Sequence, residues 1–390
     1  MGSEHELERP SPHGGWSVEI THVTDARIIP PTESNLVQKA GVFDGDGNYV
    51  PEAALWRRHR PIMEQPENVT PTGEKLKGKW LWGGVLWMHF GHFLVESTGR
   101  LWPYHDLEDE IEGILFIPKR PRNKDQIVGY QTDFFDLLGV KKQVKVVFDP
   151  TDVEELVVPG QGFGLGQIAD GTAPMRAMIH EYFAKDVKAD GPEKLYVSRA
   201  ELRAHLGGVL GEKRIENMMR AEGYEVFYPE KHSLRDQVAR YKAAKTIVGL
   251  DGSAFHIAAM VGHKDQNVAM ILRREDGAVK YLQMHLDSFT GVTSHKIDAL
   301  LTEWVPENKP KSNRLSYGEP DFEKLGQMLF DAGLIKDLDP WKPLDKKERK
   351  ALWAESGLEH GKGYKEYFKY IRKRRRARRA EREAAEAAAK

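Results

Sequence analysis

The chain of 390 residues contains no cysteine. Without a thiol it has no disulfide framework, no thiolate zinc site and no cysteine nucleophile. It also lacks a long hydrophobic run: no stretch approaches the roughly 18 apolar residues of a membrane-spanning helix, and glycines and histidines interrupt the longest candidate, 80–93. The first 20 residues show no apolar core or cleavage site of a signal peptide. The sequence therefore predicts a cytoplasmic protein.

A strong net charge is absent as well. The formal value is −1, so no overall field favours nucleic acid. The charge is unevenly distributed, because residues 361–390 carry 12 Lys and Arg against 4 Glu, which leaves −9 on residues 1–360. A hydrophobic fraction of 40% is enough to fill real cores, and the length corresponds to two domains with an extension. We expect a flexible lead (1–16), a first α/β domain (17–160), a second α/β domain (161–317) and a helical extension with a basic tail (318–390).

Strand-like and helix-like segments alternate through both halves, which predicts α/β domains with parallel, helix-covered sheets. In the first half we expect strands at 18–29, 80–87, 113–117 and 144–148, a hairpin at 42–50, and helices at 90–104 and 125–138. In the second half the expected strands are 194–199, 225–228, 246–249 and 268–272, between helices at 174–186, 211–222, 233–245 and 253–261. Ser233 is the expected N-cap of the helix 233–245. This second run is typical of a doubly wound nucleotide-binding domain.

The remaining segments are interpreted as connections and as an extension. Residues 153–158 and the glycine-rich 160–166 are interpreted as the crossing between the halves, because the glycines fit neither a Walker sequence nor a dinucleotide fingerprint. Residues 322–334 and 346–358 predict amphipathic helices, and 364–389 predicts one long helix whose second half is rich in Arg and then in Ala and Glu.

The segment 87–102 places an imidazole, a carboxylate and a guanidinium four residues apart. On a helix, His92, Glu96 and Arg100 share one face. Such groups can act as a base, as a partner that orients the base, and as an anion contact. The alternative is a solvated ladder of charged side chains. The functional interpretation is favoured because the stripe follows an apolar strand, at the kind of corner where open α/β sheets bind ligands.

Two segments of the second half are candidates for binding phosphate. Arg199 ends a predicted strand, where a guanidinium can grip a diphosphate, and Arg214 follows it; surface pairing with Glu is the alternative for either. In 249–256, a strand passes into a helix through Gly249, Gly252 and Ser253. Free N–H groups at a helix start bind phosphate, and glycine allows close approach. Ser253 is otherwise only a helix cap, and His256, one turn inside, is otherwise only a packed core residue.

Taken together, these segments resemble glycosyltransferase family 61, which includes plant xylosyltransferases and bacterial capsule or lipopolysaccharide enzymes. The resemblance covers roughly residues 80–275. It rests on the order and spacing of several short elements: 91–96 with 100–102, 196–199, 214–217, 223–226 with 229–230, 233–237 with 243–244, and 247–254.

The resemblance implies a GT-B-like pair of Rossmann-type domains with a cleft between them, an inverting mechanism and no obligatory metal or other cofactor. It places the acceptor side in 17–160 and the nucleotide-sugar site in 161–317. Glu96 or His92 is then the base, with Arg100 beside it. The implied donor-binding residues are Arg199, Arg214, Gln237, Gly249, Asp251, Gly252, Ser253 and His256.

The implied reaction transfers a hexosyl, pentosyl or N-acetylhexosaminyl group from a nucleotide sugar, with a UDP-sugar favoured, to a glycan or lipid-linked glycan. Capsule, lipopolysaccharide or exopolysaccharide biosynthesis is the corresponding role. Two other functions are open: a metal-dependent hydrolase using His89, His92 and Glu96, and, ranked low, nucleic-acid binding through the basic tail. Helical spacing puts Tyr364, Phe368 and Ile371 on one apolar side of the tail. Residues 364–379 either lie on an anionic membrane surface, which makes the enzyme peripheral to the inner membrane, or form a solvated helix that pairs with the acidic body.

Overall fold

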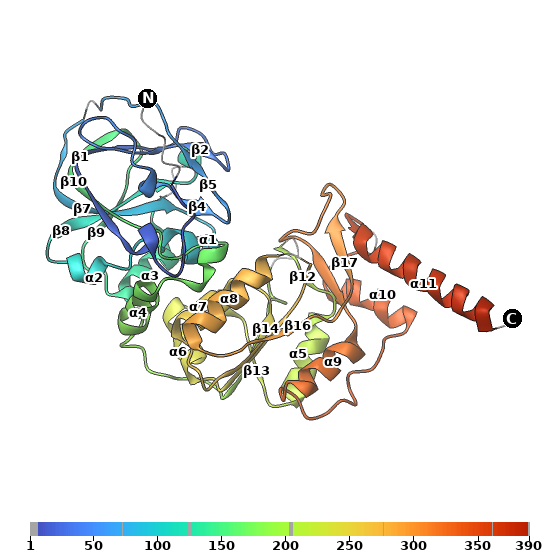
Figure 1. Cartoon of the computed structure of the whole chain (residues 1–390). Helices are drawn as coiled ribbons and strands as arrows, with labels where there is room; N and C mark the ends of the chain where they lie inside the picture. The colour runs from blue at the N-terminus through green and yellow to red at the C-terminus, as the bar shows by residue number, and fades with distance from the viewer. Residues whose placement is uncertain are drawn as a thin grey trace.

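The computed structural model describes residues 7–71, 73–123, 126–202, 206–275, 277–360 and 362–388. Within these residues the chain forms two α/β halves, from which a C-terminal helix projects (Figure 1). The described part of the expected flexible lead is packed rather than loose: the Trp16 indole donates to the Glu8 carbonyl (2.8 Å), and the Gln167 amide donates to the Pro10 carbonyl (2.9 Å). Residues 1–6 lie outside the described part.

The first half is built on a six-stranded mixed sheet in the order β3-β1-β10-β7-β8-β9. Strands β7 (Leu76–Leu86), β8 (Ile111–Pro118), β9 (Gln143–Val146) and β10 (Thr151–Pro159) are parallel, whereas β1 (Ile20–Ile29) and β3 (Gly41–Phe43) run antiparallel to their neighbours. The prediction of a crossing at 153–158 was wrong. Leu156, Val157 and Val158 are fully buried because β10 lies inside the sheet, between β1 and β7.

Short elements complete the first half. Strands β2 (Gln38–Lys39) and β6 (Met63–Glu64) pair in parallel, and β4 (Trp56–Arg57) and β5 (Arg60–Pro61) form a tight hairpin. Helix α3 (Gly129–Leu138) begins four residues later than expected, and Asp125 itself lies outside the described residues. The expected helix 90–104 is also shorter: α1 (Phe90–His92) continues as a π-helix (Phe93–Ser97), a turn follows, and α2 (Tyr104–Leu107) is separate.

The second half contains a fully parallel sheet in the order β13-β11-β14-β15-β16, formed by β11 (Lys194–Val197), β13 (Glu225–Phe227), β14 (Thr246–Leu250), β15 (Asn267–Ile271) and β16 (His295–Ile297). Counted from β11, this is the doubly wound order 2-1-3-4-5. Helices α4 (Ala173–Tyr182), α5 (Glu212–Ala221), α6 (Leu234–Ala243), α7 (Ala254–Val261) and α8 (Ala278–Thr290) accompany it. The strand order reverses between β11 and β14, where such sheets bind ligands at the strands' carboxyl ends.

The expected boundary at residue 317 falls within strand β18 (Tyr317–Pro320), so the extension is continuous with the second half. Strand β18 joins β12 (Gly208–Val209), β17 (Leu300–Pro306) and β19 (Tyr364–Glu366) in a second sheet. Helices α9 (Phe322–Asp331) and α10 (Lys346–Glu355) bury Leu325, Leu329 and Trp353 in one cluster with Tyr196 and Val248 of the parallel sheet.

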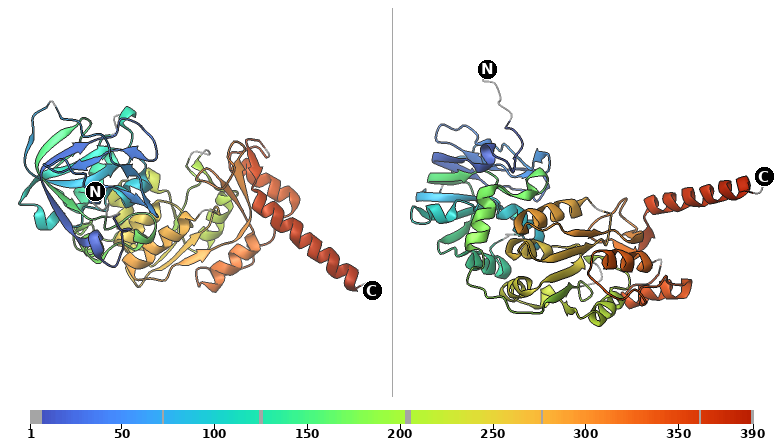
Figure 2. Two further views of the ribbon diagram at one scale, coloured as in Figure 1. Left: turned by 45° about the horizontal axis from the view of Figure 1, so that its top comes forward. Right: turned by 60° about the horizontal axis from the view of Figure 1, so that its bottom comes forward.

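Helix α11 (Phe368–Ala388) begins four residues later than expected, because 364–366 form β19 instead. At its first turn Tyr370 is buried with Leu272 and Leu300, and Lys369 pairs with Glu275. Beyond this root the helix extends away from the body in all three ribbon views (Figures 1 and 2). No helix in the described part of the chain combines the length and apolar character needed to cross a bilayer.

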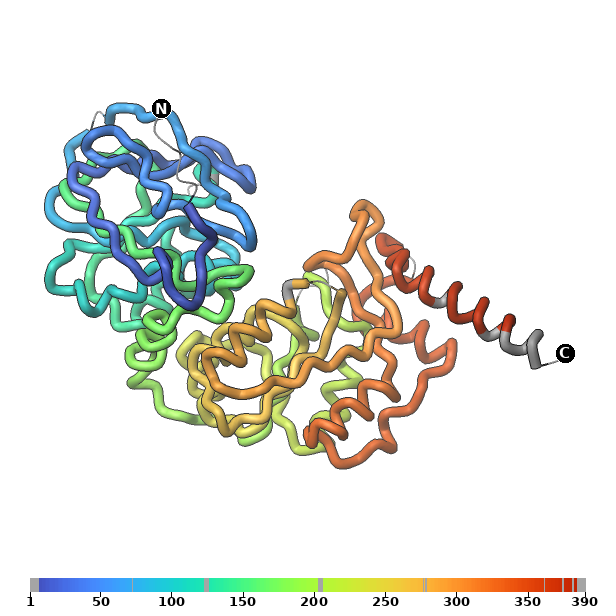
Figure 3. The backbone as a smooth tube through the Cα atoms, in the orientation of Figure 1, coloured from blue at the N-terminus to red at the C-terminus, as the bar shows by residue number. Residues whose placement is uncertain are grey.

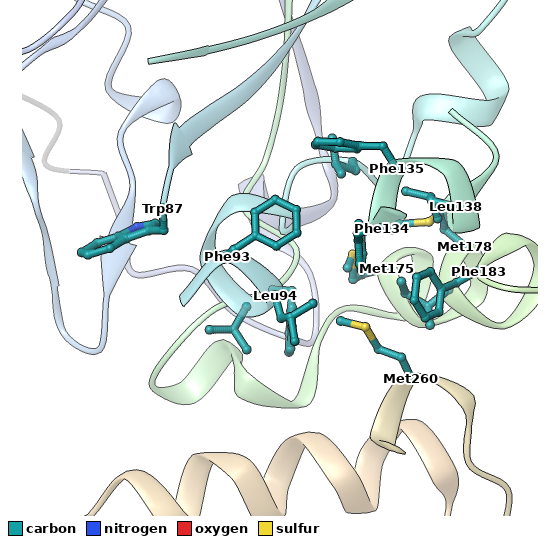
Figure 4. Close-up of a cluster of buried hydrophobic side chains, with 14 of the residues drawn as sticks. Trp87, Phe93, Leu94, Phe134, Phe135, Leu138, Met175, Met178, Phe183 and Met260 are labelled. Atoms are coloured by element: carbon teal, nitrogen blue, oxygen red, sulfur yellow. The ribbon is translucent and has the colours of Figure 1, made fainter. Parts of the chain in front are cut away.

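One hydrophobic cluster runs through both halves. It includes Leu94 of the π-helix, Met175 and Met178 of α4, and Met260 of α7. Figure 4 shows Met260 approaching the first-half side chains from the second half. In the backbone trace of Figure 3, the green segment that contains α4 lies where the two halves meet. This shared packing positions the π-helix against the start of α7.

Candidate active site

The most tightly organised polar group at the junction consists of Glu96, His92 and Arg57. The Glu96 side chain is fully buried, and the Arg57 guanidinium donates to both of its oxygens, at 2.7 Å to Oε1 and 2.6 Å to Oε2. His92 Nδ1 lies 2.7 Å from Oε2. The π-helix Phe93–Ser97 carries Glu96, and such π turns occur frequently at functional sites. The predicted His92–Glu96 pair is therefore present in the structure.

The hydrogen bonds assign different capacities to the two residues. Burial raises the pKa of Glu96, but the hydrogen bonds from His92 and Arg57 outweigh it, and the net pKa lies below its ordinary value. An ionised Glu96 accepts a hydrogen bond from the Nδ1–H of His92, which leaves Nε2 as the acceptor nitrogen of the neutral ring. The His92 side chain is 32% exposed, against 0% for Glu96. His92 can therefore reach a substrate, whereas Glu96 orients it.

Aromatic neighbours hold the His92 ring. Trp87 lies 4.7 Å from it and His89 4.9 Å, measured between ring centroids. The Arg57 guanidinium stacks over Trp87 at 4.5 Å. Burial lowers the pKa of His89 to about 4, and the neighbouring His92, Arg314 and Arg120 side chains act in the same direction. His89 is therefore neutral at physiological pH.

Arg100 does not share the face of His92 and Glu96. The helix ends at Ser97, and the Arg100 side chain turns into the protein, where it is 2% exposed. Its guanidinium donates to the carbonyls of Glu52 and Ala54, each at 2.7 Å, and of Pro159. Arg100 therefore ties β10 to the segment 52–54, and its hydrogen bonds go to backbone carbonyls rather than to an anion.

The carboxyl ends of β11 and β14 bring Arg199 beside Gly252. A side-chain carbon at Gly252 would lie 3.0 Å from the Arg199 guanidinium and would press against it. Arg199 Nε is buried and has no hydrogen-bond partner among the described residues. The loop that carries Arg199 is held by Glu212, which accepts from the Arg199 amide at 2.7 Å.

Glu212 is a buried acid at the edge of this site. Burial raises its pKa to about 7, while the hydrogen bond from the Arg199 amide and the Arg199 charge act in the opposite direction. The Ser198 hydroxyl donates to Glu216 at 2.7 Å. Glu216 lies one turn after Glu212 on α5. The strand end therefore combines a guanidinium with a carboxyl group that titrates near neutral pH.

Asp251 lies beside this site, but its carboxylate is already bound by the loop that follows β15. It is 2% exposed and accepts from the Arg273 amide at 2.9 Å, with the Arg273 guanidinium at 3.3 Å. Arg274 lies 3.8 Å from the same carboxylate. The arrangement fits a role for Asp251 in positioning two arginines.

Helix α7 begins against the first half. Ser253 precedes it but makes no side-chain cap, in contrast to Ser233, the predicted cap of α6, which accepts from the Asp236 amide at 3.1 Å. A methyl group added to Gly91 would collide with Ser253 Oγ. The N-terminus of α7 therefore lies directly against α1, one residue from His92.

His256 continues this contact on α7. Its Nδ1 lies 2.8 Å from Nδ1 of His285 on α8, which is buried and whose Nε2 has no partner in the described structure. Burial lowers the pKa of His256 to about 3, and the neighbouring imidazoles of His92 and His89 act in the same direction. His256 thus faces the His92 side of the junction as a neutral ring.

Three predicted donor residues lie elsewhere. Gly249 allows β14 to pass close to Val197, since a side-chain carbon there would lie 2.6 Å from the Val197 carbonyl. Arg214 points to the extension, 3.7 Å from Glu348. Gln237 donates to the carbonyls of Pro229 and His232, at 2.9 and 3.2 Å, and so holds the turn after β13.

Sequence reasoning missed Arg57 and His285. Arg57 lies 39 positions before Glu96, in a two-residue hairpin that carries no catalytic motif. The only local signal was the cationic run Arg57-Arg58-His59-Arg60 after a tryptophan. His285 lies on a helix that was not assigned.

The metal-hydrolase alternative finds no ligand set in the described part of the chain. No group of three or more His, Asp or Glu side chains there converges as metal ligands. Both Glu96 oxygens face Arg57, and its Oε2 also faces His92.

Comparison with known proteins shows which family and which solved structure the chain resembles. The family model described as glycosyltransferase 61 matches residues 90–268, a range that contains His92, Glu96, Arg199 and the start of α7. No curated protein matches the chain. Among solved structures, the chain is similar to the iron-containing dodecameric glycosyltransferase TibC from enterotoxigenic E. coli H10407, with 11% identity, a TM-score of 0.29, and coverage of 95% of this chain and 98% of that one.

Proposed function

The chain belongs to glycosyltransferase family 61 through residues 90–268, and from this premise we propose that it is an inverting enzyme that uses a nucleotide sugar, with a UDP-sugar favoured. The acceptor is a glycan or lipid-linked glycan, and the transferred group is a hexosyl, pentosyl or N-acetylhexosaminyl unit. The two halves are assigned as the acceptor and donor domains of a GT-B-like enzyme.

One observation carries this proposal: the contact between Gly91 and Ser253 across the two halves. It places His92 next to the start of α7, while Arg199 and Gly252 lie at the same edge of the parallel sheet. A diphosphate bound at the helix start and Arg199 would therefore hold its sugar toward His92. That order is what direct displacement at an anomeric carbon requires.

In the proposed reaction the acceptor hydroxyl attacks the anomeric carbon and loses its proton to Nε2 of His92. The bond from that carbon to the diphosphate oxygen breaks, and the electron pair leaves with the nucleoside diphosphate. Glu96 holds the His92 tautomer and stabilises the imidazolium, in the way a carboxylate supports a catalytic histidine. Arg199 and the α7 amides stabilise the leaving group's charge.

Binding measurements test the donor class. Thermal unfolding is recorded with each nucleoside diphosphate, since a ligand that binds only the folded state raises the unfolding midpoint. We expect at least one of them to raise the midpoint and Arg199→Ala to weaken that binding by about 1.5–3 kcal/mol, the value of a hydrogen bond to a charged group. Lys188→Ala, a change at an exposed site away from the strand ends, is the matched control. Failure of all nucleoside diphosphates to bind would contradict the proposal.

The tail is proposed to hold the enzyme at an anionic inner-membrane surface, where lipid-linked acceptors of capsule, lipopolysaccharide or exopolysaccharide biosynthesis reside. The basic part of α11 extends away from the acidic body (Figure 2), and Phe368 at its base is 47% exposed. Each Lys or Arg near such a surface contributes about 1 kcal/mol. The predicted apolar face of Tyr364, Phe368 and Ile371 is reduced, because Tyr364 lies in β19 and contacts Tyr317.

Vesicle sedimentation tests the tail. A chain ending at residue 361 would lose β19 and the buried Tyr370, so charge neutralisation is the sharper change. Arg→Gln at the exposed Arg375, Arg376, Arg378 and Arg379 should abolish pelleting with anionic vesicles and leave unfolding unchanged. Equal pelleting of the two proteins, or equal pelleting with neutral vesicles, would count against a membrane role.

A further inference from the structure

A pocket of about 210 Å³ opens on the side of Arg199 that faces the extension. Arg199, Gly207, Gly208 and Glu212 form one wall, and Tyr317 of β18 and the turn 355–357 after α10 form the other. Tyr317 and 355–357 lie outside the range matched by the family model. The extension therefore builds part of a pocket whose remainder belongs to the family domain.

We infer that this pocket receives the nucleoside end of the donor and that the turn 355–357 selects which nucleoside is accepted. The inference rests on the proposed function. Displacement requires the sugar at His92 and the diphosphate between the α7 start and Arg199. The nucleoside, at the other end of the donor, then lies beyond Arg199, where this pocket is located.

The size and lining of the pocket suit that end of the molecule. Whole drug-sized ligands occupy roughly 300–1,000 Å³, so about 210 Å³ fits part of a nucleotide sugar. Gly207 and Gly208 add no side chains of their own to the first wall, and Tyr317 supplies an aromatic surface on the other. Arg199 Nε, buried and without a partner in the described residues, points to an anionic group at the pocket's edge.

The turn 355–357 is held in place rather than loosely apposed. Ser356 Oγ accepts from the Gly211 amide at 3.2 Å, which links the turn to the start of α5. Gly357 has a φ of 68°, in the left-handed region that favours glycine. A change at Ser356 therefore alters the pocket wall without touching Arg199 or α7.

The test compares ligands that share a diphosphate. Binding of UDP, ADP, GDP, CDP and inorganic pyrophosphate is measured by calorimetry to the full chain and to Ser356→Trp, which fills the pocket from the extension side. The tightest nucleoside diphosphate should bind the variant at least tenfold more weakly, whereas pyrophosphate affinity should stay within twofold. Ala200→Trp, from the opposite wall, should have the same effect, and it replaces Ser356→Trp if that variant does not fold. Glu359→Trp, at an exposed site beyond the turn, is the matched control.

Unchanged nucleoside diphosphate affinity in both filled variants would overturn the inference and leave the proposed function standing. An equal loss of pyrophosphate and nucleoside diphosphate binding would also overturn it, because the pocket would then serve the phosphates. Absence of any nucleoside diphosphate binding to the unmodified chain would instead remove the proposed function on which the inference rests.

Discussion

Removing the His92 imidazole while Glu96 and Arg57 stay in place distinguishes a loss of proton transfer from a loss of the folded structure. His92→Ala should lower the turnover number by about 10²–10⁴-fold, the range that a positioned general base contributes. Donor affinity should change little, because Arg199 and the start of α7 do not contact the ring in the proposed binding mode. The assay follows UDP release from a UDP-sugar with a glycan acceptor, at saturating concentrations of both.

The structure also sets the expected change in stability. The His92 side chain is 32% exposed and makes one hydrogen bond to Glu96, while Arg57 makes two. Loss of His92 therefore costs at most about 1.5–3 kcal/mol. Glu96→Gln leaves the Arg57 charge without its partner in a buried site, and breaking such a pair costs about 3–5 kcal/mol. The two variants should thus differ: His92→Ala loses rate, whereas Glu96→Gln loses rate and stability together.

Two results would refute this reasoning. One is a turnover number for His92→Ala within threefold of the unmodified enzyme, with both proteins shown to be folded at the assay temperature. The other is a Glu96→Gln variant that keeps full activity, because the His92 tautomer would then not depend on the carboxylate. Partial recovery of His92→Ala by added imidazole would support the assignment directly.

Four further predictions follow from the site and its surroundings. Arg100→Met should lower the free energy of unfolding by about 3–5 kcal/mol, since it leaves three backbone carbonyls without their donor; unchanged denaturation would disprove this structural role. Gly91→Ala should reduce kcat/KM through collision with Ser253, and a second change, Ser253→Gly, should restore part of it. Nucleoside diphosphate affinity should fall as pH rises through about 7, because ionisation of Glu212 adds a negative charge beside the ligand; in calorimetry Glu212→Gln should remove this contribution, while the titration of the ligand's own phosphate at about pH 6 remains. Burial lowers the folded-state pKa of His285, so its contribution to stability is present above the unfolded pKa of about 6.5 and is lost as pH falls; His285→Phe should flatten the decline in unfolding midpoint between pH 7 and 5.

The second half was predicted well from sequence because its signals are local. Apolar strand runs, the Ser233 cap and the loops at strand ends each depend on neighbouring residues, and β11, β14 and α7 appear close to the expected positions. Arg199 and Gly252 were found for the same reason, since both follow a strand directly. The first half was predicted less well. The long-range pairing of β10 with β1 and β7 depends on partners up to about 140 residues away, so β10 was mistaken for a connection.

In the candidate site, too, contacts between neighbouring residues were predicted and long-range contacts were not. The i, i+4 spacing predicted the His92–Glu96 contact, but it also placed Arg100 on that face, because the periodicity assumed an uninterrupted α-helix. The π turn and the break after Ser97 redirect Arg100 to backbone carbonyls. Helical periodicity also predicted an apolar face on the tail through Tyr364, whereas pairing with β17 draws that residue into a strand.

The sequence by itself therefore determined the alternation of the main strands and helices from α4 to β15, the cap at Ser233 and the candidate groups at His92, Glu96 and Arg199, because these features arise from residues close along the chain. Only the tertiary structure decided which of these groups meet. It brought Arg57 to Glu96, set Gly91 against Ser253 and placed the extension beside Arg199. Such contacts join segments far apart in sequence, and the packing of the shared core, rather than any local pattern, selects them.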